Sequence, residues 1–143
     1  MPALEYLLLA EYVRQDGNFV HIMAAGLDSF FIPAGGLPAA FPVGAFARIS
    51  FSSRDEVGAE HDVKLVFQGP TGDDLLTVSQ RFLAPARAPD LPEHWRPSIS
   101  IVFRLALPLT GHGAYRLQVM LDDDPRMSRS VDVRAVEPGP GQY

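Results

Sequence analysis

Apolar and polar residues alternate over the segment from 98 to 121, SISIVFRLALPLTGHGAYRLQVML. Apolar residues occupy every second position, six times in the first part of this segment and four times in the second. They are Ile99, Ile101, Phe103, Leu105, Leu107 and Leu109, then Tyr115, Leu117, Val119 and Leu121. Successive side chains of a strand point to opposite faces, so this pattern indicates half-buried strands. The segment therefore predicts a pair of such strands joined by the short Gly-rich connection T-G-H-G.

The same alternation recurs through most of the chain, interrupted by Gly, Pro and Asp at intervals near ten residues. The further predicted strands are Phe19–Met23, Gly26–Ile32, Ala45–Phe51, His61–Gln68, Leu76–Phe82 and a last one marked by Val131 and Val133. Short strands at this spacing are typical of sandwiches and barrels, whereas strands that alternate with helices indicate a parallel sheet. We predict an all-β fold, a single antiparallel β-sandwich of about eight to nine strands.

The segment Ala3–Arg14 allows two interpretations. Its Ala, Leu and Glu content favours a helix by intrinsic propensity. However, Leu4, Tyr6, Leu8, Ala10 and Tyr12 also share one strand face, and the following Asp-Gly pair at 16–17 is favoured in two-residue hairpins. We prefer a strand that pairs with the predicted strand from Phe19.

Residues 107–119 contain Gly113-Ala114-Tyr115, which resembles the Gly-x-Tyr strand entry of immunoglobulin-like and fibronectin-like domains. This resemblance implies an immunoglobulin-like sandwich in which the tyrosine hydroxyl ties a corner of the fold. The order of motifs also resembles small bacterial β-sandwich proteins of unknown function: LLLAEYV at 7–13, DGNFVHIMAAG at 16–26 and G-x-Y-x-L-x-V-x-L-D at 113–122. That resemblance implies no particular activity.

Length and composition bound the class of protein. The 143 residues fit one domain, which we expect over 1–136, with a frayed tail over 137–143. The net charge of −5 and the scattered basic residues argue against nucleic acid as a partner. The chain has no cysteine, which excludes disulfides and thiolate sites.

The expected location is the bacterial cytoplasm. Acidic residues bracket the apolar run near the N-terminus, unlike a secretory signal, and no apolar stretch has the length of a membrane span. Lys64 is the only lysine beside eleven arginines, a bias typical of a GC-rich bacterial genome.

The sequence contains no catalytic or metal-binding motif that we could identify, so we predict no enzyme, no cofactor and no metal. The four histidines lack the spacing of short metal motifs, and His61 points away from both of its acidic neighbours if all three lie in a strand. The acidic run Asp122–Asp124 lacks the spacing of a calcium loop. We interpret it as a solvated hairpin tip and leave cation binding there open.

Aromatic residues give the clearest indication of a binding surface. A Gly/Pro-rich stretch from Pro33 to Phe46 is predicted to be a loop that carries an exposed apolar patch. The candidate interaction surface consists of Phe30, Phe31, Leu37, Phe41 and Phe46. We therefore expect a non-enzymatic interaction or structural module, with a protein partner or self-association through the patch or a sheet edge.

Two other function classes stay open. A small-ligand or carbohydrate-binding sandwich would use His94, Trp95 and Arg96 from the Pro-rich segment 84–97, because an aromatic ring beside polar groups suits sugar stacking. A hydrolase would require several His, Asp or Glu side chains to converge in one pocket.

Overall fold

The computed structural model describes residues 2–16, 19–52, 54–86, 90, 92 and 94–135. Alternating apolar segments form strands throughout this part of the chain, as predicted. The strands are β1 (Ala3–Asp16), β2 (Phe19–Ala25), β3 (Ser29–Phe31), β4 (Ala39–Ser50), β5 (Glu60–Gln68), β6 (Asp74–Leu83), β7 (Ser98–Leu109), β8 (Gly113–Leu121) and β9 (Asp124–Arg134). A single 3-10 turn, η1 (Ala34–Gly36), is the only helical element of the described residues, and none of them forms a helix with the length and apolarity to cross a membrane.

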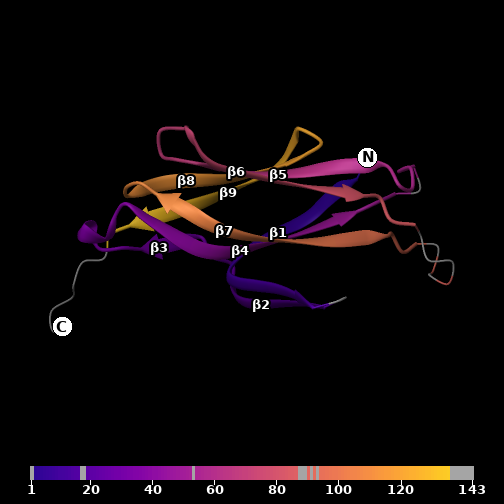
Figure 1. Cartoon of the computed structure of the whole chain (residues 1–143), viewed down its shortest axis with the longest axis horizontal. Helices are drawn as coiled ribbons and strands as arrows, with labels where there is room; N and C mark the ends of the chain where they lie inside the picture. The colour runs from indigo at the N-terminus through magenta and orange to yellow at the C-terminus, as the bar shows by residue number, and fades with distance from the viewer. Residues whose placement is uncertain are drawn as a thin grey trace.

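The strands form two sheets that lie one above the other (Figure 1). Sheet A has four strands in the order β2-β1-β4-β7, and sheet B has five in the order β3-β9-β8-β5-β6. The all-β prediction is confirmed. The antiparallel prediction needs one correction, because β3 pairs with β9 in parallel. The short β3 reaches its neighbour after a crossover rather than a hairpin, which allows the parallel direction.

The main core lies between the two sheets and contains the apolar face of each long strand. On β7 and β8 the buried residues are the ones that the alternation predicts, from Ile101 to Leu109 and from Tyr115 to Leu121. These two strands do not pair with each other, however, since β7 pairs with β4 and β8 pairs with β5 and β9. The connection between them therefore carries the chain from sheet A to sheet B.

Only the first part of the segment Pro33–Phe46 is a loop, which corrects the prediction. Strand β4 begins at Ala39 and pairs with β7 along its full length, while its pairing with β1 extends only to Gly44. Pro42 lies beyond the last β1 partner, so the proline needs no amide hydrogen on that side. For this reason the Pro- and Gly-containing stretch still forms a strand.

Strand β1 changes its partner halfway along, which confirms the strand interpretation of Ala3–Arg14. Its first half pairs with β4, and its second half, from Ala10 onward, pairs with β2. The β1–β2 hairpin thus leaves the plane of sheet A, and β2 lies outside both layers at the bottom of Figure 1.

A second apolar cluster, the outer cluster, lies beneath this hairpin on the side of sheet A away from the core. Its residues are Ala10, Val13 and Phe46, which are buried, and Tyr6, Leu8, Val20, Ile22 and Val102, which are partly buried. A Cβ atom on Gly44 would lie 2.6 Å from Cγ2 of Val13 and 2.7 Å from its backbone nitrogen. The absence of a side chain at Gly44 therefore allows the hairpin to approach the sheet.

Candidate functional site

The β1–β2 hairpin carries apolar side chains on both of its faces. Its inner side contributes Val13, Val20 and Ile22 to the outer cluster. The strand register pairs Tyr12 with Met23 and places the opposite set of side chains on the other side. We call that side the hairpin face, and it consists of Tyr12, Arg14, Asp16, Phe19, His21 and Met23.

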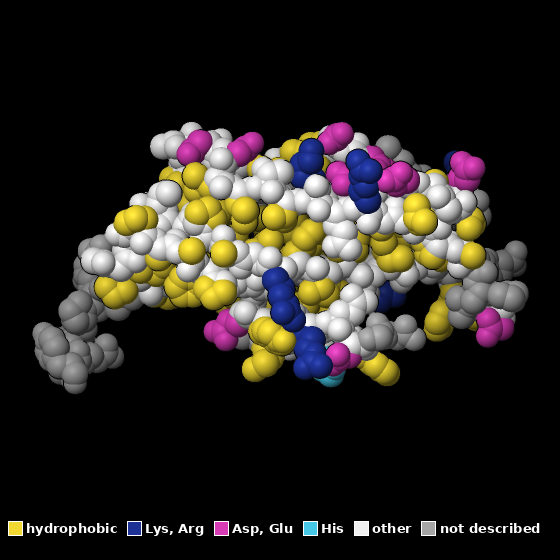
Figure 2. Space-filling view, viewed as in Figure 1, with side chains coloured by type: hydrophobic (Ala, Val, Ile, Leu, Met, Phe, Trp, Pro, Cys, Tyr) yellow, Lys and Arg dark blue, Asp and Glu magenta, His cyan; other side chains and the backbone are white. Residues whose placement is uncertain are grey.

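Three large apolar side chains of the hairpin face are exposed. The exposed fractions are 41% for Tyr12, 74% for Phe19 and 62% for Met23. Hydrophobic side chains project beside basic ones along the lower margin of Figure 2, where β2 lies. Elsewhere, exposed large apolar residues come from several separate elements, namely Phe31, Phe41, Val57, Leu83 and Trp95. The hairpin face therefore holds the densest set within one element pair of the described residues.

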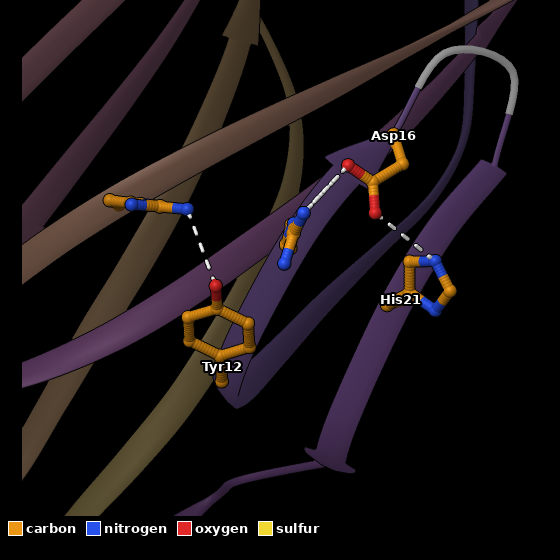
Figure 3. Close-up of polar contacts among 5 residues, drawn as sticks. Tyr12, Asp16 and His21 are labelled. Carbon is orange, nitrogen blue, oxygen red and sulfur yellow. Dashed lines mark hydrogen bonds and ion pairs between the residues drawn. The ribbon is translucent and has the colours of Figure 1, made fainter.

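The polar groups of the hairpin face are paired with one another (Figure 3). Asp16 accepts hydrogen bonds from the Arg14 guanidinium at 3.1 and 3.2 Å, and its other carboxylate oxygen lies 3.5 Å from Nε2 of His21. Arg104 of β7 lies over the Tyr12 ring, 5.5 Å from its centroid. These contacts hold the aromatic ring and the charged groups in place while the apolar surfaces stay in solvent.

The predicted interaction surface does not form one patch. Phe31 and Phe41 are exposed, but the Phe30 ring is buried against Phe41 at 4.9 Å between centroids. Leu37 packs against the main core. In the sequence, Phe46 alternates with Ala45 and Ala47 and so points away from the main core. It is nevertheless buried in the outer cluster, because the hairpin covers it.

The alternative ligand residues do come together. His94, Trp95 and Arg96 line a pocket of about 580 Å³ where β4 and β6 end and β7 begins. The other lining residues that the structure describes are Phe51, Ser52, Asp55, Val57, Ala84, Pro85 and Pro97. Ser52 and Asp55 were not predicted, since nothing in a short polar turn marks it as part of a pocket.

Asp55 is held in place at the rim of this pocket. Its carboxylate accepts hydrogen bonds from the backbone nitrogen of Ser52 at 2.6 Å and from the Ser52 hydroxyl at 3.1 Å. Burial acts to raise the pKa of Asp55, but hydrogen bonds that include these two outweigh it and hold the pKa below its ordinary value. The pocket thus combines a fixed carboxylate with a basic and aromatic wall.

His61 and Asp122 form a close pair in sheet B. Nδ1 of His61 lies 2.7 Å from Asp122, which also accepts a hydrogen bond from the Asp62 amide at 2.9 Å. The His61 ring stacks on Phe82, and its Nε2 atom is buried, with no hydrogen-bond partner among the described residues. This arrangement joins β5 to the β8–β9 turn.

The acidic turn is engaged in contacts within the fold. Asp122 and Asp123 have φ angles of 52° and 63°, the left-handed conformation that a two-residue hairpin loop requires. Asp123 accepts a hydrogen bond from Lys64 at 3.0 Å. Within the described ranges, no group of three or more His, Asp or Glu side chains could hold a metal ion.

Sequence reasoning missed the hairpin face, although the signal was present. Within β1, Val13 and Tyr12 lie on opposite faces, and within β2, Val20 and Ile22 lie on the face opposite to Met23, so apolar residues occur on both faces of the hairpin. A hairpin with two apolar faces must cover one surface and expose another unless it lies between two layers. The turn at positions 17 and 18 lies outside the described residues.

Comparison with known proteins identifies a family whose function is unknown. Residues 5–134 match a family model described as a family of unknown function (DUF6941), and the chain belongs to that family. This match agrees with the resemblance to proteins of unknown function inferred from the motifs. No curated protein matches the chain.

Proposed function

We propose that this member of the DUF6941 family is a non-enzymatic interaction module whose binding surface is the hairpin face. The observation that carries the proposal is the exposure of Tyr12, Phe19 and Met23 on one side of one hairpin. Large exposed apolar groups that lie together mark sites of protein association, and aromatic residues and Met are enriched in such interfaces. This surface replaces the one around Phe30 and Phe46 that the sequence predicted.

The way in which the hairpin is attached supports the same proposal. The outer cluster anchors the hairpin through Val13, and Arg104 fixes the Tyr12 ring. A surface that is ordered before binding loses less conformational entropy on association. The hairpin face thus combines exposed apolar area with a rigid support.

We assign the architecture to the immunoglobulin-like sandwiches as part of this proposal. The support is the Tyr115 hydroxyl, which accepts hydrogen bonds from the amides of Thr110 and Gly111 at 3.1 and 3.0 Å and donates one to the Gly111 carbonyl. A tyrosine that ties the corner between two sheets is a hallmark of that class. The bacterial cytoplasm stays the predicted location.

A site-specific photocrosslinker tests the proposal. A photoreactive phenylalanine analogue is placed at Phe19, on the hairpin face, or at Phe31, a matched position in β3 that is 64% exposed. We expect discrete adducts in cells of the native host from position 19 and only background from position 31. Equal labelling from both positions, or no discrete adduct from position 19, would contradict the proposal.

A second candidate function is small-ligand binding at the pocket that contains Trp95. The observation that favours it is the convergence of His94, Trp95 and Arg96 with Asp55 around about 580 Å³, a volume within the usual range of ligand sites. A planar ring or sugar could stack on Trp95 while Arg96 and Asp55 bind its polar groups.

A glycan array with three proteins tests this candidate. The wild type and Trp95→Phe, which retains an aromatic face, should bind the same glycan, and Trp95→Ala should lose at least about tenfold in affinity, equivalent to about 1.4 kcal/mol. Absence of binding by the wild type to every glycan would count against carbohydrate as the ligand.

A further inference from the structure

We propose that the partner of the hairpin face is a second copy of this chain, which adds its β2 to the β2 edge in an antiparallel pair about a twofold axis. This inference rests on the proposed function and names its partner. The pairing would join the two four-stranded A sheets into one continuous sheet.

The β2 strand is the sheet edge with the least protection in the described part of the chain. It contains no Pro, Lys, Arg, Asp or Glu over its seven residues, Phe19–Ala25. By contrast, β7 carries Arg104 and Pro108, β6 carries Asp74 and Arg81, and β3 has only three residues. Charged residues, prolines and a short length are the usual features that keep an edge strand from pairing with another chain. Of these features, β2 has only a moderate length.

The backbone of β2 can accept another strand. In an antiparallel pair, every second residue directs its N–H and C=O groups away from its partner. Strand β2 pairs with β1 on one side and has no strand on its other side among the described residues. A further strand would satisfy these groups with main-chain hydrogen bonds, as in β-strand addition.

The outward side chains of β2 are arranged symmetrically, which favours a copy of the same strand. Phe19 and Met23 lie on the hairpin face at equal distances from His21. In an antiparallel pair centred on His21, Phe19 of each copy would lie opposite Met23 of the other. A ring next to a thioether is a favourable contact. A twofold interface requires such self-complementarity.

Charge does not oppose a second copy at the β2 edge. The chain carries a net charge of −5, so two copies repel each other on average. On the hairpin face, however, Arg14 and Asp16 neutralise each other at 3.1 Å. Most acidic side chains visible in Figure 2 lie along the opposite margin. The β2 edge is therefore a place where two acidic copies can approach.

Single-cysteine variants test this inference, because the chain has no cysteine of its own. His21→Cys places a thiol on β2 opposite its own copy at the centre of the pair, whereas Met23→Cys places one opposite Phe19 of the other copy. Ser79→Cys places a thiol on the exposed part of edge strand β6 as a matched control. Directly opposed residues of antiparallel strands have Cα atoms about 4.5–5.5 Å apart, within the range of a disulfide.

Under mild oxidation at low protein concentration, we expect His21→Cys to form a disulfide-linked dimer of twice 15.6 kDa several times faster than Met23→Cys or Ser79→Cys. Circular dichroism confirms that each variant is folded. Equal rates at the three positions, or no dimer from His21→Cys, would overturn self-pairing. If self-pairing fails but the crosslinker at Phe19 still captures a different protein, the hairpin face remains a binding surface; if both fail, both proposals fall.

Discussion

The β8–β9 and β1–β2 hairpins have similar alternating sequences but different surroundings. Strands β8 and β9 lie within sheet B, with β5 on one side and β3 on the other. Their apolar residues, such as Leu117 and Val131, are buried on the core side, and neither strand contributes a large exposed apolar residue. The β1–β2 hairpin lies at the edge of sheet A and exposes three of them.

The β8–β9 hairpin is integrated into its sheet without a second apolar side. The β8–β9 hairpin is stabilised by one apolar side, by Tyr115 at one end and by Asp122 at the other. The β1–β2 hairpin is likewise held by one apolar side, the outer cluster. Its second apolar side contributes little to the stability of a monomer, which is why we assign it to association.

The largest difference in the free energy of unfolding is expected between alanine substitutions of buried residues in the two hairpins. Leu117→Ala opens a cavity in the main core and should lower the free energy of unfolding by about 2–5 kcal/mol. Val13→Ala removes two methyl carbons from the outer cluster and should cost only about 1–2 kcal/mol. Urea unfolding followed by circular dichroism measures both. Equal costs would mean that the β1–β2 hairpin is as integral to the fold as β8–β9.

Gly44→Ala is expected to detach the β1–β2 hairpin specifically. The new Cβ would overlap the side chain and backbone of Val13, at a cost of about 1–3 kcal/mol. Amide hydrogen exchange should accelerate in β2 and stay unchanged in β8 and β9. Gly35→Ala, where a Cβ meets nothing within 4 Å, is the control. Faster exchange in both hairpins would indicate that they unfold together.

Replacing a tyrosine by phenylalanine in each hairpin compares a hydroxyl that is bonded within the fold with one at the surface. Tyr115→Phe leaves the amides of Thr110 and Gly111 without their acceptor and should cost about 1–2 kcal/mol. Tyr12→Phe removes a hydroxyl that lies 3.5 Å from Arg104 at the surface and should cost almost nothing. Thermal unfolding of both variants measures the difference, and comparable losses would contradict it.

The smallest expected effect concerns acid stability at the β8–β9 turn. Burial acts to raise the pKa of Asp122, but hydrogen bonds from His61 and the Asp62 amide hold it below its ordinary value of 3.8. A carboxyl with a lowered pKa in the folded state stabilises the protein above its ordinary pKa, and this contribution is lost as the pH falls through the lower value. Wild type should therefore lose stability below about pH 4 more steeply than Asp122→Asn, and equal slopes would exclude this contribution.

Much of the fold follows from the sequence because strand alternation is a local property. The parity of Ile101 and Leu117 identifies the buried face of each strand, and Tyr115 marks the corner between the sheets. Pairing partners are not local, so the separation of β7 and β8 into different sheets could not be predicted. Pro42 misled the prediction because its position at the end of the β1 ladder depends on that pairing.

The candidate site was harder to predict than the strands, because the exposure of a residue depends on which other element covers its face of the sheet. The parity of Phe46 indicated a residue pointing away from the core, but its burial depends on a hairpin that folds back over it. Trp95 and Asp55 meet only because distant strand ends converge. The two apolar faces of the β1–β2 hairpin could have been recognised from the sequence, since Val13 and Tyr12 differ in parity.

The most direct test of the account is the solution mass of three proteins, measured by light scattering over a dilution series. Met23→Lys places a charge on the hairpin face, and Leu83→Lys places one at a position of β6 with the same exposed fraction, 62%. We expect the mass of wild type and Leu83→Lys to rise from 15.6 kDa toward twice that value with concentration, while Met23→Lys stays at 15.6 kDa. A wild type that stays monomeric throughout, or a Met23→Lys variant that associates like the wild type, would contradict it.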